Sequence, residues 1–239
     1  MRPRIVCLPF LLAIAAFGFG QMPGNGGTVT QASFGLLDDP AVRKEVKLTS
    51  AQDSFVKGEF KRANDALQKV VSKRPTNEAE MKAAQAKMRT LQEALIVNLQ
   101  RKLTPPQSKR LRELGLQFFG PFAMISPEIQ KELGLTSAQA AKVKAAQKSL
   151  MDKTKELQAM RRDQVRTIPQ PKDRNDQKAV KEYVTKVQAM VAKFGPGDGK
   201  TISGYKRAAE AQALNVLSAA QKAKWQAMKG VKFTPPKGK

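Results

Sequence analysis

Apolar residues recur at spacings of three and four along two consecutive segments in the first half of the chain. Residues 50–73 carry one stripe, formed by Val56, Phe60, Ala63, Leu67, Val70 and Val71. Residues 78–101 carry a second, formed by Met81, Ala84, Met88, Leu91, Leu95 and Leu99. Such spacing is typical of amphipathic helices, and the break at Ser72–Asn77 is short. The pattern predicts two antiparallel helices whose apolar stripes bury one another.

The second half repeats this plan on a larger scale. One stripe consists of Val143, Ala146, Leu150, Leu157 and Met160, and its return partner carries Val180, Val184, Val187, Val191 and Phe194. The connection contains Ile168-Pro169-Gln170-Pro171, and the run from Gly195 to Gly199 ends the return helix. Further helices are expected over 201–216 and up to about Met228.

No segment alternates apolar and polar residues for long enough to form a convincing strand. We therefore expect an all-α fold of two tandem helical-hairpin units with short capping helices and no sheet. The first unit would span 36–119 and the second 120–230. A mobile leader would occupy 21–35, and a loose basic tail 231–239.

A recurring motif marks where helices begin. It consists of Leu, then Thr or Ser, two spacers and Gln, and its members are Leu48, Thr49 and Gln52; Leu103, Thr104 and Gln107; Leu135, Thr136 and Gln139; and Leu217, Ser218 and Gln221. In a capping box, the hydroxyl of the Thr or Ser accepts a hydrogen bond from the backbone amide of the Gln three residues later. The side chain of that Gln in turn accepts a hydrogen bond from the backbone amide of the Thr or Ser. Pro105 would follow one such cap, where its missing N–H costs nothing. The leading Leu is expected to pack against a neighbouring helix.

The four copies fall in two pairs, which indicates an internal duplication. Shifting residues 36–52 by 87 positions gives eight identities in seventeen, from Pro40 matched to Pro127 through to Gln52 matched to Gln139. Asp39-Pro40 and Ser126-Pro127 each open a short helix in front of a long one. Asn77 and Glu80 predict one further capping box.

The N-terminus is typical of a secretory signal. Arg2 and Arg4 precede an apolar run over 5–19, and Gly18-Phe19-Gly20 offers a small-x-small cleavage site. The run is shorter than the about 20 residues that a membrane-spanning helix needs. Cys7 lies too early in it to be a lipoprotein cysteine. We expect export to the periplasm or the extracellular space after cleavage near Gly20.

After cleavage the chain would contain no Cys and no His. This excludes disulfides, thiol nucleophiles, His general bases and the ligands that zinc, nickel and copper sites prefer. Carboxylates such as Asp38, Asp39 and Glu45 match no catalytic or cation-binding pattern and more simply cap helices. We therefore expect no enzyme, no catalytic residue, no metal and no cofactor.

Net charge narrows the choice of partners. The full chain carries +23, and removal of Arg2 and Arg4 would leave +21, spread over every predicted helix. In an exported protein the anionic partners would be unfolded acidic chains, envelope polymers or lipid headgroups. Nucleic acid is not expected in that compartment, and self-association is left open.

The two halves meet at an apolar stretch, 118–125. It is either a buried seam or an exposed docking surface. The candidate client-binding residues are Phe118, Phe119, Phe122 and Met124. The methionines Met81, Met88, Met151, Met160 and Met190 have the same two interpretations, since Met fills cores and also suits adaptable binding surfaces.

With its signal, its helical pattern and its paired Leu-Thr-x-x-Gln motifs, the chain resembles the Spy and CpxP group of periplasmic stress proteins. The resemblance covers residues 36–230 as two tandem units, each with one motif pair. It implies an ATP-independent chaperone-like or stress-responsive envelope factor that holds unfolded or partly folded envelope proteins. The histidines through which some relatives bind zinc or nickel are missing here. The alternative is a basic structural protein that binds anionic envelope polymers or lipid headgroups through charge alone.

Overall fold

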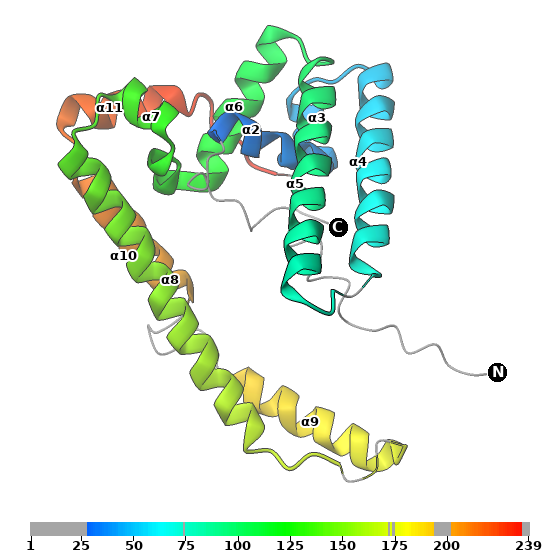
Figure 1. Ribbon diagram of the computed structural model, residues 1–239. Coiled ribbons are helices and arrows are strands. Elements are labelled where there is room, and N and C mark those ends of the chain that lie inside the picture. Colours follow the sequence, from blue (N-terminus) through cyan, green and yellow to red (C-terminus); the bar gives the residue numbers. More distant parts are fainter. Residues whose placement is uncertain (1–27, 74, 172, 174, 194–201, 236–239) are drawn as a thin grey trace. The chain divides into compact units, whose positions relative to one another are not determined.

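The computed structural model describes residues 28–73, 75–171, 173, 175–193 and 202–235 (Figure 1). Every regular element in these ranges is helical and none is a strand, which confirms the all-α class. The predicted signal (1–20), the first part of the predicted leader (21–27) and the run 195–199 lie outside the described residues.

The chain divides into two compact units, but not at the expected boundary. Unit 1 comprises residues 1–134 and 219–239, and unit 2 comprises residues 135–218. The apolar stretch after Phe119 therefore belongs to the first unit and does not open the second. The closing helix also belongs to unit 1, because it packs against the short helix that follows this stretch.

Unit 1 is built around an antiparallel hairpin. Its helices α4 (Ser50–Val71) and α5 (Glu78–Gln100) end within two residues of their predicted limits. Against one end of the hairpin lie α2 (Val29–Ser33), η1 (Phe34–Asp38), α3 (Pro40–Glu45) and α6 (Pro105–Phe119) (Figure 1). The shared core consists of Phe34, Leu37, Val42, Val46, Val56, Leu95, Leu99, Leu111 and Leu114.

Ordered structure begins before Leu36, so the predicted leader is wrong for residues 28–35. Thr28 and Gln31 form a capping box that starts α2, and Val29 and Phe34 are buried. Helix α2 lies so close to α6 that a Cβ on Gly115 would lie 1.8 Å from Ser33 Oγ. Packing against α6, and not an apolar stripe of its own, therefore holds this five-residue helix.

The apolar stretch after α6 forms η2 (Gly120–Ile125), followed by α7 (Pro127–Leu133). Residues 121–125 of η2 are all buried within unit 1. The stretch is therefore buried and no exposed docking surface at these residues, but it lies inside unit 1 and is not the expected seam between two halves.

The C-terminal segment is held in place as far as Phe233. After α11 (Ala219–Met228), Gln117 Nε2 donates to the carbonyls of Lys229 (2.7 Å) and Val231 (2.8 Å). The amide of Phe233 donates to Gln117 Oε1 at 2.8 Å, and its ring packs against the core. The prediction of a loose tail from residue 231 is thus wrong for 231–233, and residues 236–239 lie outside the described part.

Unit 2 consists of α8 (Ser137–Arg166), α9 (Gln177–Lys193) and α10 (Ile202–Asn215). The main partner of α8 is α10, whereas α9 makes the smaller contact, so the expected α8–α9 hairpin is only a minor part of the packing. Val143 and Ala146 on α8, Ala209 and Ala213 on α10, and Leu217 are buried.

Candidate functional site

The repeated motif does start helices, as predicted. Thr49 Oγ1 accepts from the Gln52 amide at 3.2 Å, and Gln52 Oε1 accepts from the Thr49 amide at 2.9 Å. Thr136 and Gln139 form the same box at the start of α8. At α6, Gln107 Oε1 accepts from the Thr104 amide at 2.9 Å, with Pro105 in the first helical position. Helix α11 begins directly after Ser218.

The two glutamines of the first pair also join two helix starts. Gln52 Nε2 donates to the Lys102 carbonyl (2.7 Å) and to Gln107 Oε1 (2.9 Å). In return, Gln107 Nε2 donates to the Lys47 carbonyl (3.0 Å) and to Gln52 Oε1 (2.9 Å). Each acceptor carbonyl lies two residues before the N-cap of the other box. One amide side chain therefore caps its own helix and holds the neighbouring one.

The glutamines of the second pair donate to carbonyls at the same position relative to a motif. In unit 2, Gln139 Nε2 donates to the Val216 carbonyl at 2.7 Å, two residues before Ser218. In unit 1, Gln221 Nε2 donates to the Gly134 carbonyl at 3.1 Å, two residues before Thr136. Leu48 and Leu103 pack against the core of unit 1, and Leu217 is buried. The motif residues thus build the scaffold of the fold.

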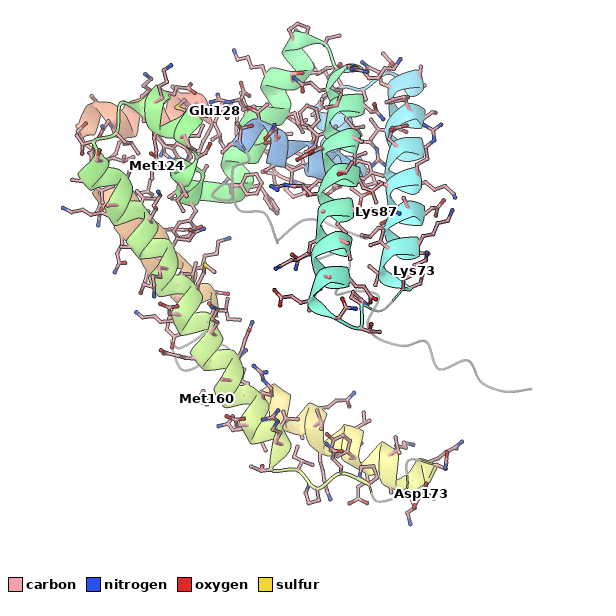
Figure 2. The ribbon with its side chains drawn as sticks, in the orientation of Figure 1. Lys73, Lys87, Met124, Glu128, Met160 and Asp173 are labelled. Atoms are coloured by element: carbon pink, nitrogen blue, oxygen red, sulfur yellow. The ribbon has the colours of Figure 1, made fainter. Side chains whose placement is uncertain are left out.

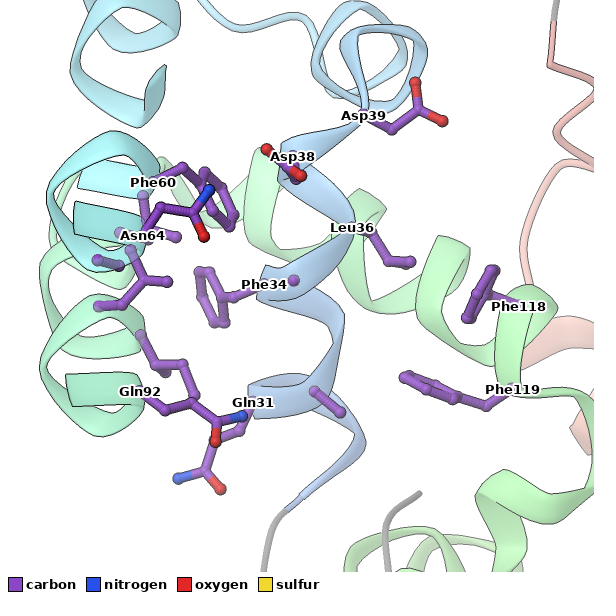
Figure 3. Close-up of a pocket in the computed structure, with 16 residues that line it drawn as sticks. Gln31, Phe34, Leu36, Asp38, Asp39, Phe60, Asn64, Gln92, Phe118 and Phe119 are labelled. Carbon is purple, nitrogen blue, oxygen red and sulfur yellow. The ribbon is translucent and has the colours of Figure 1, made fainter. Parts of the chain in front are cut away.

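Unit 1 contains an apolar pocket of about 330 Å3, framed by α2, η1, α4, α5 and α6 (Figure 3). Phe34 points from η1 toward α4 and α5, whereas Phe118 and Phe119 approach from the end of α6. The apolar lining residues are Ala32, Phe34, Leu36, Phe60, Ala63, Leu95, Ile96, Leu99, Phe118 and Phe119. Pockets that bind small molecules or side chains are commonly of this size and composition.

Polar groups complete the lining of the pocket. They come from Gln31, Asp38, Asp39, Asn64 and Gln92. Asp39 Oδ1 accepts from the Ala41 amide at 2.7 Å, so this carboxylate caps α3. The pocket therefore offers aromatic and aliphatic surface inside and a few hydrogen-bonding groups beside it.

Arg43 holds the η1 wall of the pocket in place. Its buried guanidinium donates to the carbonyls of Leu37 (2.8 Å) and Asp38 (2.7 Å) and pairs with Asp53 at 2.6 Å. These partners offset the cost of removing its charge from water. A hydrogen bond from Lys57 is the largest influence on the pKa of Asp53 and lowers it, and Arg43 acts in the same direction.

The structure separates the four predicted client-binding residues. Phe118 is 48% exposed and lines the pocket, and Phe119 is nearly buried beside it. Their rings meet edge to face with centroids 5.5 Å apart. Phe122 and Met124 are fully buried, because η2 turns their side chains into the core, so the prediction that they form a binding surface is wrong. Sequence reasoning missed Phe34, which belongs to the segment taken as leader.

The methionines are also divided. Met81, Met151 and Met160 are about half exposed, whereas Met88 and Met190 are partly buried.

Within the described residues, no group of three or more His, Cys, Asp or Glu side chains could hold a metal ion. None of the helices searched there is long and apolar enough to cross a membrane.

The chain was compared with known proteins at three levels. No protein-family model, no curated protein and no solved structure matches it.

Proposed function

We propose that this chain is an exported, ATP-independent binding protein that holds apolar segments of unfolded or partly folded proteins. The observation that carries the proposal is the pocket of unit 1, where five helical elements surround about 330 Å3 of mainly apolar space next to the half-exposed Phe118. A site of this kind accepts an aromatic or aliphatic side chain without requiring one sequence.

The charge of the chain supplies the second part of the mechanism. With the +21 that remains after the proposed cleavage, the protein attracts acidic chain segments over several ångströms and raises the rate of encounter. Burial of an apolar side chain in the pocket then slows release, because dissociation would return that apolar surface to water. Salt does not screen this contribution, so it should persist at moderate ionic strength. The resemblance to the Spy and CpxP group supports the same proposal.

The test is suppression of aggregation. A chemically denatured acidic substrate is diluted into buffer with an equimolar amount of the chain beginning at Gln21, and light scattering is followed. We expect suppression that survives moderate salt and is weakened by Phe118→Ser. The matched control is Met151→Gln, which changes a similarly exposed side chain in unit 2 and should leave suppression intact.

Two outcomes would contradict the proposal. Absence of suppression at equimolar ratio would refute client holding. Suppression that vanishes in moderate salt and ignores Phe118→Ser would instead favour the alternative, a protein that binds polyanions through charge alone.

A further inference from the structure

The far end of the α4–α5 hairpin carries apolar side chains that the core of unit 1 does not cover. We call this end the hairpin tip and define it as residues 69–73 and 75–87. Val71, the last residue of α4, is 58% exposed, and Met81, in the first turn of α5, is 51% exposed. At about 1.5 Å per residue, Met81 lies only about 5 Å along the helix from the start of α5. Two large apolar side chains are thus presented at one end of the hairpin.

Lysines surround the same end. Lys69, Lys73 and Lys87 line an open depression between the two helices, with Val70, Ala83 and Ala84 among its other lining residues. Figure 2 shows Lys73 and Lys87 on the lower part of the hairpin as drawn. Among the described residues, no carboxylate forms an ion pair with any of these three lysines.

The acidic residues of the tip already have partners. Glu78 pairs with Lys82 at 2.8 Å. The Glu80 carboxylate accepts from the Thr76 amide (2.7 Å), the Thr76 hydroxyl (2.9 Å) and Asn77 Nδ2 (3.1 Å). The hairpin tip, as defined above, contains four basic and two acidic side chains, so it carries net positive charge.

We propose that the hairpin tip is a docking surface for a membrane that carries anionic lipid headgroups. Lys69, Lys73 and Lys87 contact the headgroups, while Val71 and Met81 enter the boundary between headgroups and acyl chains. A dissolved polyanion would match the lysines but would leave the two apolar side chains in water. An anionic bilayer surface matches both features, because it offers negative charge directly above hydrocarbon.

The inference does not depend on the pocket of unit 1. The core of unit 1 draws on residues 55–63 of α4 and 95–99 of α5, which lie away from the hairpin tip. Substitutions at the exposed tip therefore leave that core intact, and the two surfaces can be tested separately.

The experiment measures sedimentation with vesicles of phosphatidylcholine, with or without phosphatidylglycerol. It uses the chain beginning at Gln21, which keeps every described helix and lacks the predicted signal that would itself enter a bilayer. One variant combines Lys69→Gln, Lys73→Gln and Lys87→Gln. Its control, Lys142→Gln with Lys144→Gln and Lys222→Gln, removes the same charge from exposed lysines elsewhere. A second variant combines Val71→Ser and Met81→Gln, and its control combines Val184→Ser and Met151→Gln in unit 2.

We expect binding only to vesicles that contain phosphatidylglycerol. The tip lysine variant should bind about 100-fold more weakly, since each lysine near an anionic surface contributes a factor of about five. The tip apolar variant should bind about tenfold more weakly, because partial burial of two apolar side chains is lost. Both controls should stay within about threefold of the unsubstituted chain. Circular dichroism is used to check that each variant is folded.

Three results would overturn the proposal. Equal losses in the lysine variant and its control would show that charge acts without a defined surface. Full binding by the tip apolar variant, together with complete competition by dextran sulfate, would show an interface for polymers. Equal binding to vesicles of phosphatidylcholine alone would show that the anionic headgroup is not recognised.

Discussion

At the residue scale, the internal duplication is clearest at one backbone position. Lys47 has a φ of +57° and is the only non-glycine residue with positive φ among those described. The residue 87 positions later is Gly134, with a φ of +63°. Both directly precede the Leu of a motif and supply a carbonyl to a motif glutamine. The same turn therefore occurs twice, once with a glycine, which adopts positive φ readily, and once with a lysine, which does not.

This difference predicts opposite effects of glycine substitutions. A left-handed conformation costs a non-glycine residue about 1 kcal/mol, and Lys47→Gly removes this cost. Part of the gain is lost because glycine has more freedom in the unfolded chain, so the substitution should stabilise the protein by about 0.5 kcal/mol. Gly134→Ala should destabilise by about 1 kcal/mol from backbone strain alone, since a Cβ there meets no atom within 4 Å. Urea unfolding measures both.

The control for this comparison is Gly58→Ala inside α4, where a Cβ also meets nothing within 4 Å. In a helix interior, Ala in place of Gly should stabilise by about 1 kcal/mol. If Gly134→Ala behaved like Gly58→Ala, the proposed equivalence of the two turns would be wrong.

At the element scale, the motif glutamines join helix starts as well as capping them. Gln52 and Gln107 exchange side-chain hydrogen bonds and each hold a carbonyl of the opposite turn. Gln139 and Gln221 each donate to a carbonyl two residues before a motif Ser or Thr, as Gln52 and Gln107 do.

This joint predicts strong coupling in a double-mutant cycle. Gln52→Ala and Gln107→Ala should each cost about 1–2 kcal/mol, because each leaves a shared set of hydrogen bonds incomplete. The double variant should cost at least about 0.5 kcal/mol less than the sum. Gln68→Ala, on the exposed side of α4, serves as the control and should change stability by less than about 0.5 kcal/mol. Additive effects of Gln52 and Gln107 would show that the two boxes act separately.

The start of α5 predicts a pH dependence. The backbone amide of Thr76, followed by its hydroxyl, lowers the pKa of Glu80 below its usual value of about 4.3. The stabilisation from this carboxylate is therefore fully present above the unfolded pKa and is lost as the pH falls through the lower, folded pKa. An NMR titration of the Glu80 carboxyl should give a midpoint below about 4.3. A midpoint at or above that value would contradict the cap described here.

How far the sequence predicts the structure differs between elements. Helices α4, α5 and α8 are predicted closely because Thr49, Asn77 and Thr136 fix their starts and long apolar stripes follow. Helix α2 is too short for a stripe, although Thr28 and Gln31 carry a capping signature that a search for boxes alone would have found. The sequence favours α9 as the partner of α8 because α9 carries the longer apolar stripe. Helix α10 is the main partner instead, and it buries the small side chains of Ala209 and Ala213, which do not stand out in the sequence.

At the scale of the whole molecule, the candidate site also depends on contacts between distant segments, which the sequence pattern does not predict. The pocket of unit 1 combines α2, η1, the middle of α4, the second half of α5 and the end of α6, and several of these segments are far apart in the sequence. Phe118 was predicted as a binding residue because its neighbours are apolar, yet those neighbours, Phe122 and Met124, form the core. Local composition located the region, but only packing decides which of its side chains face the pocket.

The most direct test of client holding is to map where an unfolded polypeptide binds. The chain beginning at Gln21 is labelled with nitrogen-15, and a permanently unfolded acidic polypeptide is added while backbone amide shifts are followed. We predict that the largest shifts occur around the pocket, at Phe34, Phe60 and Phe118, and persist in moderate salt. Shifts confined to exposed lysines and abolished by salt, with the pocket residues unchanged, would contradict the account.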